Sequence, residues 1–171
     1  MLSAAALGCL LGMFPVSAQT DSAAGKAPVD RRLIREFLGQ TRSALEAGDT
    51  TAAQAWLDSL LATDPGNQET PYLGARLRLA SGDTTGAETL LAEGMAQAPL
   101  SGRLKLLSAR ILMARGRIPE AVELVAGVLA VKPGDPEARY LQGSIALADG
   151  DTTGALDLWE QALKTELEGG P

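Results

Sequence analysis

The chain has no histidine and only one cysteine among its 171 residues. Without histidine it cannot build a Ser-His-Asp or Cys-His catalytic site, and it offers no imidazole ligand to a metal ion. A single cysteine cannot form an internal disulfide or a cysteine-rich zinc site. We therefore expect a protein that is not an enzyme and that has no catalytic residues, metal ligands or cofactor.

Positive charge is also scarce. The sequence holds 15 Lys and Arg against 21 Asp and Glu, which gives a formal net charge of −6. Nucleic-acid-binding domains are usually basic, so nucleic acid is not an expected partner. Hydrophobic residues make up 46% of the chain, an ordinary share for a folded domain. The composition therefore favours one folded domain that binds something other than nucleic acid.

The first 18 residues have the pattern of a secretory signal peptide. Residues 2–14 are apolar and uncharged, and Val16-Ser17-Ala18 supplies small residues before a cleavage point after Ala18. The apolar run is shorter than the roughly 20 residues that span a membrane. We expect export to the periplasm or the cell exterior, with no stable membrane span after cleavage.

Two alternatives concern this segment. Its start carries no Lys or Arg, which leaves an uncleaved N-terminal anchor open, and Ala6-Leu7-Gly8-Cys9 loosely resembles a bacterial lipoprotein box. A lipidated cysteine normally opens a polar tether, whereas the apolar run here continues to Phe14. The cleaved signal peptide, residues 1–18, is the favoured interpretation, followed by a flexible polar leader over residues 19–30.

The rest of the chain repeats itself every 34 residues. Three sets of residues recur at this spacing: Gly48, Gly82, Gly116 and Gly150; Ala53, Ala87, Ala121 and Ala155; and Pro65, Pro99 and Pro133. Three independent markers on one period are very improbable by chance, and this period is typical of stacked helix-turn-helix units. The period divides residues 31–169 into four repeats, which span 34–67, 68–101, 102–135 and 136–169.

The repeat resembles the tetratricopeptide (TPR) family. Position 8 of each unit is small (Thr41, Ala75, Ala109, Gly143), position 20 is the alanine above, and position 24 is large (Leu57, Leu91, Val125, Trp159). Small residues let the two helices of a hairpin approach closely, while the large residue fills the space beside them. The resemblance implies an all-α fold: an α-solenoid of four hairpins in a right-handed superhelix, each with a helix A and a helix B.

Local signals fit this arrangement. Asn67, Ser101 and Asp135 stand where they would cap the following helix A, and the threonines at position 17 (Thr50, Thr84, Thr152) stand where they would cap helix B. The repeated glycine at position 15 suits a helix end that needs a positive φ.

Charge separates strongly between the two kinds of helix. The expected A helices (31–47, 68–81, 102–115, 136–149) hold eleven basic and five acidic residues, whereas the expected B helices (51–63, 85–98, 119–131, 153–168) hold one basic and nine acidic residues. In TPR stacks the A helices line the concave face. The acidic chain is therefore expected to carry a basic groove.

The family precedent places positions 2, 5, 9 and 12 of helix A toward that groove. Arginine binds carboxylates through two parallel hydrogen bonds, and tyrosine gives contact area at low entropic cost. We expect the groove to bind a protein or peptide, with acidic or C-terminal carboxylate groups. The alternative is that these arginines only pair with nearby acids such as Glu46, Glu69 and Glu137. The candidate groove residues are Leu38, Tyr72, Leu106 and Tyr140; Arg42, Arg76 and Arg110; and Leu45, Leu79, Met113 and Leu147.

Three functions remain open at this point. The leading one is a non-enzymatic module of the bacterial cell envelope that binds a peptide or partner protein in its groove. The second is a structural component that assembles through its ends and convex face. The third is suggested by the stretches 138–143 and 155–159, which look like the periplasmic TPR domain of cytochrome c maturation factors and imply binding of an apocytochrome.

The last helix adds one expectation. Leu156, Leu163 and Leu167 extend its apolar arc beyond what one helix A can cover, and no capping helix follows in this sequence. We expect a weak homodimer, or a partner, docked on the C-terminal repeat.

Overall fold

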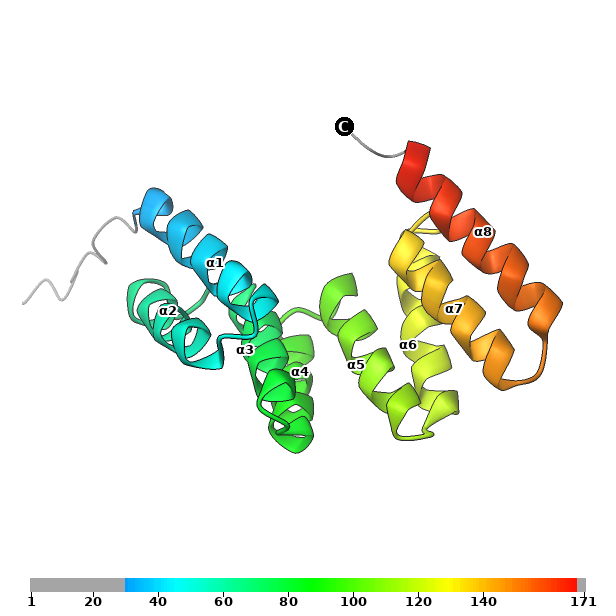
Figure 1. Cartoon of the computed structure of the whole chain (residues 1–171), viewed down its shortest axis with the longest axis horizontal. Coiled ribbons are helices and arrows are strands. Elements are labelled where there is room, and N and C mark those ends of the chain that lie inside the picture. Colours follow the sequence, from blue (N-terminus) through cyan, green and yellow to red (C-terminus); the bar gives the residue numbers. More distant parts are fainter. Residues whose placement is uncertain (1–29, 169–171) are drawn as a thin grey trace, which may run out of the picture.

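The computed structural model describes residues 30–168 as eight helices joined by short turns. Consecutive helices form four hairpins that stack into an arc with α1 at one end and α8 at the other (Figure 1). The expected all-α solenoid is thereby confirmed, while the signal peptide and most of the leader lie outside the described residues. The helices are α1 (Arg31–Glu46), α2 (Thr50–Thr63), α3 (Thr70–Ala80), α4 (Thr84–Gln97), α5 (Gly102–Ala114), α6 (Ile118–Val131), α7 (Pro136–Ala148) and α8 (Thr152–Glu168).

The turn inside each hairpin depends on the repeated glycine. Gly48, Gly82, Gly116 and Gly150 have φ values of 74°, 79°, 74° and 88°, a region that disfavours residues with a Cβ. In three hairpins the aspartate that follows caps helix B: the side chains of Asp49, Asp83 and Asp151 accept hydrogen bonds from the backbone of Ala52, Gly86 and Gly154. The expectation that threonine caps these helices was wrong, because each helix begins one residue earlier and takes the threonine as its first residue.

The starts of the A helices follow the sequence less evenly. Asp135 caps α7 through a hydrogen bond from the backbone N–H of Ala138, as expected. Ser101 stands at the start of α5, but its side chain makes no capping bond. Asn67 was wrongly expected to cap α3, which begins only at Thr70. Its side chain instead accepts from the backbone N–H of Glu69 in the preceding turn.

The core runs along the arc as three apolar clusters. In each cluster, side chains of a helix B meet those of the next helix A: Leu57 with Leu73, Leu91 with Leu107, and Val125 with Leu141. The small residues inside hairpins are fully packed, with Ala53, Ala87, Ala121 and Ala155 all at 0% exposure. Gly143 leaves no room for a larger residue, because a Cβ there would lie 2.6 Å from Nε1 of Trp159.

The A helices occupy the inner side of the arc. Each helix B packs against the next helix A, and successive A helices also touch one another: α1 with α3, α3 with α5, and α5 with α7. Among the described helices no such contact joins successive B helices. Helices on the inside of a curved stack come closer together than those outside, so the concave face is built from α1, α3, α5 and α7. None of the helices in residues 30–168 is both long enough and apolar enough to cross a membrane.

Candidate functional site

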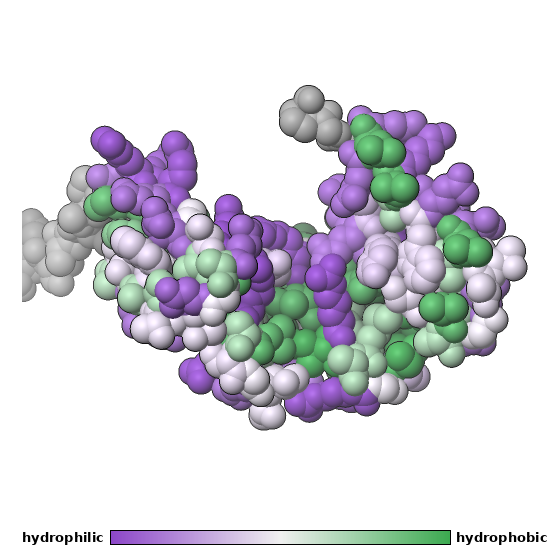
Figure 2. Space-filling view, in the orientation of Figure 1, coloured by the Kyte–Doolittle hydropathy of each residue, from purple (hydrophilic) through white to green (hydrophobic). Residues whose placement is uncertain are grey.

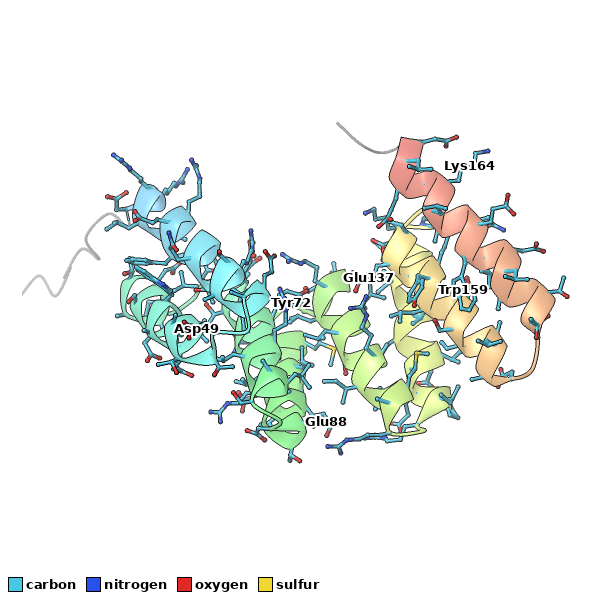
Figure 3. All side chains as sticks on the ribbon, viewed as in Figure 1. Asp49, Tyr72, Glu88, Glu137, Trp159 and Lys164 are labelled. Atoms are coloured by element: carbon cyan, nitrogen blue, oxygen red, sulfur yellow. The ribbon has the colours of Figure 1, made fainter. Side chains whose placement is uncertain are left out.

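Four of the residues expected in the groove line a single concave space of about 700 Å³: Tyr72, Arg76, Arg110 and Tyr140. They come from α3, α5 and α7, three successive A helices. Figure 3 shows Tyr72 and Glu137 toward the inner side of the arc and Trp159 between α7 and α8, with Glu88 and Asp49 lying away from the opening. The other lining residues are Pro136, Glu137, Trp159, Ala162, Leu163 and Glu166.

Arginines at position 9 form ion pairs at the two outer junctions between repeats. Arg42 pairs with Glu69, which is position 2 of the next repeat. Arg110 pairs in the same way with Glu137, with 3.0 Å between its Nη2 and Oε1 of the glutamate. The alternative that the arginines pair with acids therefore holds for Arg42 and Arg110.

The central junction differs because position 2 of repeat 3 is Arg103. Arg76 lies where the outer arginines lie, yet within residues 30–168 it has no ion pair. Its guanidinium lies over the ring of Tyr72, 5.9 Å from the centroid, and that of Arg103 lies over the same ring at 4.4 Å. Arg103 also reaches Glu69, with 3.2 Å between its Nη1 and Oε2. Since Glu69 is shared with Arg42, three arginines and one glutamate leave this region with an excess of two positive charges.

Aromatic side chains form the C-terminal wall of the groove. Tyr140 is 52% exposed and stacks on Trp159, with ring centroids 6.1 Å apart and an interplanar angle of 28°. Nε1 of Trp159 donates a hydrogen bond of 3.0 Å to the carbonyl oxygen of Tyr140, which fixes the indole beside α7. The wall thus offers a flat apolar surface whose position is set by the hairpin itself.

The aliphatic candidates lie in more varied places. Leu147 is 45% exposed on the last turn of α7. Leu38, Leu45, Leu79 and Met113 are partly buried and pack against the core clusters. They can offer a groove ligand only part of their surface.

Leu106 corrects the expectation for position 5. It is 2% exposed and belongs to the cluster between repeats 3 and 4. In this repeat positions 3, 5 and 6 are all leucine, so α5 buries a wider arc than the other A helices and takes position 5 into the core.

Arg103, Glu137 and Trp159 were not among the expected groove residues. A signal for the first two was present, because family precedent places position 2 on the groove side together with positions 5, 9 and 12. Trp159 occupies a position that fills hairpins in this family, and only its stacking on Tyr140 brings it to the groove wall. Across residues 30–168, no three His, Cys, Asp or Glu side chains are grouped as they would be around a metal ion.

The comparisons with known proteins agree on the fold. A family model described as tetratricopeptide repeat matches residues 44–101 and 78–145. A crystal structure of MamA superposes with a TM-score of 0.61 at 17% identity, covering 84% of this chain and 82% of that one. MamA from Desulfovibrio magneticus RS-1, residue 41 to the end, gives 0.60 at 18% identity, with coverages of 80% and 77%.

A more distant repeat protein is also similar. A tetratricopeptide repeat protein from Parabacteroides merdae ATCC 43184 gives a TM-score of 0.57 at 15% identity, covering 78% of this chain and 53% of that one. At these identities the likeness is one of fold. No curated protein sequence matches the chain.

Proposed function

Since the chain belongs to the tetratricopeptide repeat family, whose stacks are scaffolds for protein–protein interaction, we propose that it binds an extended segment of a partner protein in its concave groove. The observation that carries this proposal is the central junction. There the guanidinium groups of Arg76 and Arg103 both lie over the ring of Tyr72, and Arg76 has no ion pair with a carboxylate among the described residues.

The chemistry of the junction suits a carboxylate. A guanidinium presents planar pairs of N–H donors that match the two oxygens of a carboxylate, and a partly desolvated pair is stronger than one in open water. The side chain of Arg103 is 53% exposed, so a ligand can reach it without disturbing the core. The Tyr140–Trp159 wall then offers an apolar surface for a neighbouring side chain of the same segment.

The partner is therefore a peptide that combines an acidic side chain or C-terminal carboxylate with a nearby apolar residue. The role is one of binding without catalysis. The many acids on the B helices keep the convex face negative, which directs an acidic segment to the concave side by repulsion as well as attraction.

Export of the protein is part of the proposal. It rests on the uncharged apolar run at residues 2–14 and on the small residues ending at Ala18. Mass spectrometry of the N-terminus of protein secreted by the producing cell tests it. A first residue of Gln19 supports cleavage, whereas a retained Met1 or a lipidated Cys9 contradicts it.

Site-specific crosslinking tests the groove. A photoreactive phenylalanine analogue replaces Tyr72 in one variant and the exposed Val122 of α6 in a matched control. We expect one dominant crosslinked protein from position 72, and its loss when Arg76 and Arg110 are changed to Glu. A crosslink that survives this reversal, or that is equally strong from position 122, points instead to assembly through the ends or the convex face.

A further inference from the structure

The first three B helices (α2, α4 and α6) each pack against the helix A of the next repeat, whereas the corresponding face of α8 is not covered by any described helix. Three times along the arc, a helix B is covered by two aliphatic residues four apart on the next helix A. These pairs are Leu73 and Leu77 on α2, Leu107 and Ile111 on α4, and Leu141 and Ile145 on α6. Among the described residues α8 packs only on α7, and no helix takes that place on it.

The 34-residue period identifies the face. Adding 34 to Val125, Val128 and Leu129 of α6, which pack with α7, gives Trp159, Ala162 and Leu163. Leu129 is partly buried by its neighbours, whereas Leu163 is 57% exposed; Ala162 is only 6% exposed, so Leu163 supplies most of the open apolar surface of this face. Leu156 is equally exposed at 59%, but its counterpart Val122 is 42% exposed even where a helix follows, so Leu156 lies outside this face. Figure 2 shows hydrophobic patches along the arm that ends in α8.

We propose that this face, which we call the α8 face (Trp159, Ala162, Leu163, Glu166), docks a basic amphipathic helix of a partner protein. The contact between each helix B and the next helix A, seen three times, indicates the shape of the partner: a helix with two aliphatic residues four apart on one side. The charge comes from α8 itself, which carries Asp157, Glu160, Glu166 and Glu168 against the single base Lys164.

A second copy of the chain fits the α8 face poorly. In α1 the two positions that would meet it are Gly39 and Ser43, both exposed and lacking aliphatic side chains. That end of the stack therefore has the polar surface of a cap. Two α8 helices from different copies would instead bring eight acids together across one contact. Neither arrangement matches the observed interfaces between repeats.

The α8 face is continuous with the concave groove but independent of the arginine row. Trp159, Ala162, Leu163 and Glu166 line the same 700 Å³ space as Tyr72 and Arg76. A partner that inserts a helix against α8 could thus lead its adjoining chain directly into the groove. The helix site itself requires none of the arginines.

A peptide taken from the chain tests the α8 face. Residues 102–115, acetylated and amidated, carry Leu107 and Ile111 four apart, four bases and no acid. Because this peptide lacks tryptophan, it can be titrated into the full chain carrying Trp56→Phe while the emission of Trp159 is followed. We expect saturable binding that Leu163→Asp weakens at least tenfold. Leu156→Asp adds the same charge at an equally exposed site on the same helix and is expected to change the affinity less than twofold.

A second peptide separates the apolar contact from charge alone. Residues 102–115 with Leu107→Gly and Ile111→Ser keep all four bases and present at the two contact positions the residue types that α1 has there, at Gly39 and Ser43. We expect this peptide to bind at least tenfold more weakly than residues 102–115. Helix binding is measured with the peptide alone and no groove segment present, so a failed groove would not be mistaken for a failed helix site.

Three results would overturn the proposal. They are the absence of saturable binding, equal weakening by Leu163→Asp and Leu156→Asp, and equal binding of the two peptides. Sedimentation velocity adds a fourth. A dimer of the wild-type chain that Leu163→Asp abolishes and that the peptide 102–115 does not dissociate would show that a second copy occupies the α8 face.

Discussion

The outer and central junctions of the concave face use the same scaffold but treat their arginines differently. At the outer junctions, position 9 of one repeat pairs with position 2 of the next: Arg42 with Glu69 and Arg110 with Glu137. At the central junction position 2 is Arg103, and Arg76 is left beside Tyr72. One change of residue type at position 2 thus turns an internally neutralised contact into one with an excess of positive charge.

The comparison also shows where an acidic protein carries a local excess of positive charge, as the proposed binding of an acidic segment requires. Five of the ten arginines in the A-helix segments form ion pairs within residues 30–168, so the count of charges overstates the basicity of the groove; they are Arg42, Arg78, Arg103, Arg110 and Arg115. The excess positive charge is concentrated at the central junction, around Arg76 and Arg103. The following experiments change the packing of the hairpins, the screening of charge by salt, or the charged residues at the two kinds of junction.

The largest effect is expected from breaking the hairpins that carry the junctions. Gly143→Leu adds a side chain at a site where even a Cβ would lie 2.6 Å from Nε1 of Trp159. Ala87→Leu enlarges a side chain that is fully buried in repeat 2. Each should lower the free energy of unfolding by about 1–3 kcal/mol, with Gly143→Leu the more severe. Thermal and urea denaturation measure this. Unchanged stability in both variants would refute the assigned repeat register.

Salt should affect the groove next most strongly. Exposed charges are screened over about 8 Å at physiological ionic strength and over about 3 Å at 1 M. We expect the affinity of the crosslinked partner segment to fall about tenfold between 50 mM and 500 mM NaCl. The variant with Arg76 and Arg110 changed to Glu should lose most of this dependence. Parallel salt profiles for the two proteins would show that binding does not use these arginines.

Glu137→Arg is expected to make the third junction resemble the central one. It removes the partner of Arg110 and adds a guanidinium at position 2, where Arg103 stands in the preceding repeat. Affinity for the same segment should rise about threefold, which is less than 1 kcal/mol. Fluorescence anisotropy with a labelled segment measures this, and Glu160→Arg on α8 controls for the change in net charge.

The smallest effect is expected on stability when Glu69 is neutralised. Glu69→Gln weakens its ion pairs with Arg42 and Arg103, but the carboxylate is 34% exposed, and pairs this open contribute about 0–1 kcal/mol. We expect a loss of less than 1 kcal/mol in urea denaturation. A larger loss would mean that the glutamate holds the outer junction together and that the arginines serve the fold.

Much of the fold could be predicted from local sequence because the same helix and turn signals recur in all four repeats. The positive φ of Gly48 and its equivalents and the helix bounds follow from turn and capping chemistry. Errors arose where two residues compete for one role. Asp49 and Thr50 can both cap a helix, and only the exact start of α2 decides between them. Pro71 stands at the start of α3, which begins only at Thr70, and the other repeats have no proline at this position.

The groove was less predictable because its charges meet across repeats. The pairing of Arg110 with Glu137 depends on how far one hairpin rotates against the next, which no single repeat encodes. Leu106 shows the same limit, since its burial depends on the width of the apolar arc that α7 covers. Position 2 could still have been weighed from the sequence, because Glu69, Arg103 and Glu137 alternate in sign there.

The most direct test is a charge-conserving exchange between the two kinds of junction. The double variant Arg103→Glu with Glu137→Arg keeps the net charge of −6 and moves the arginine at position 2 from the central to the third junction. Titration calorimetry with the crosslinked segment should show about a threefold loss of affinity, because a loss of about tenfold expected from Arg103→Glu is partly offset by the gain expected from Glu137→Arg. Wild-type affinity in the double variant would contradict the account, because net charge rather than the central junction would then control binding.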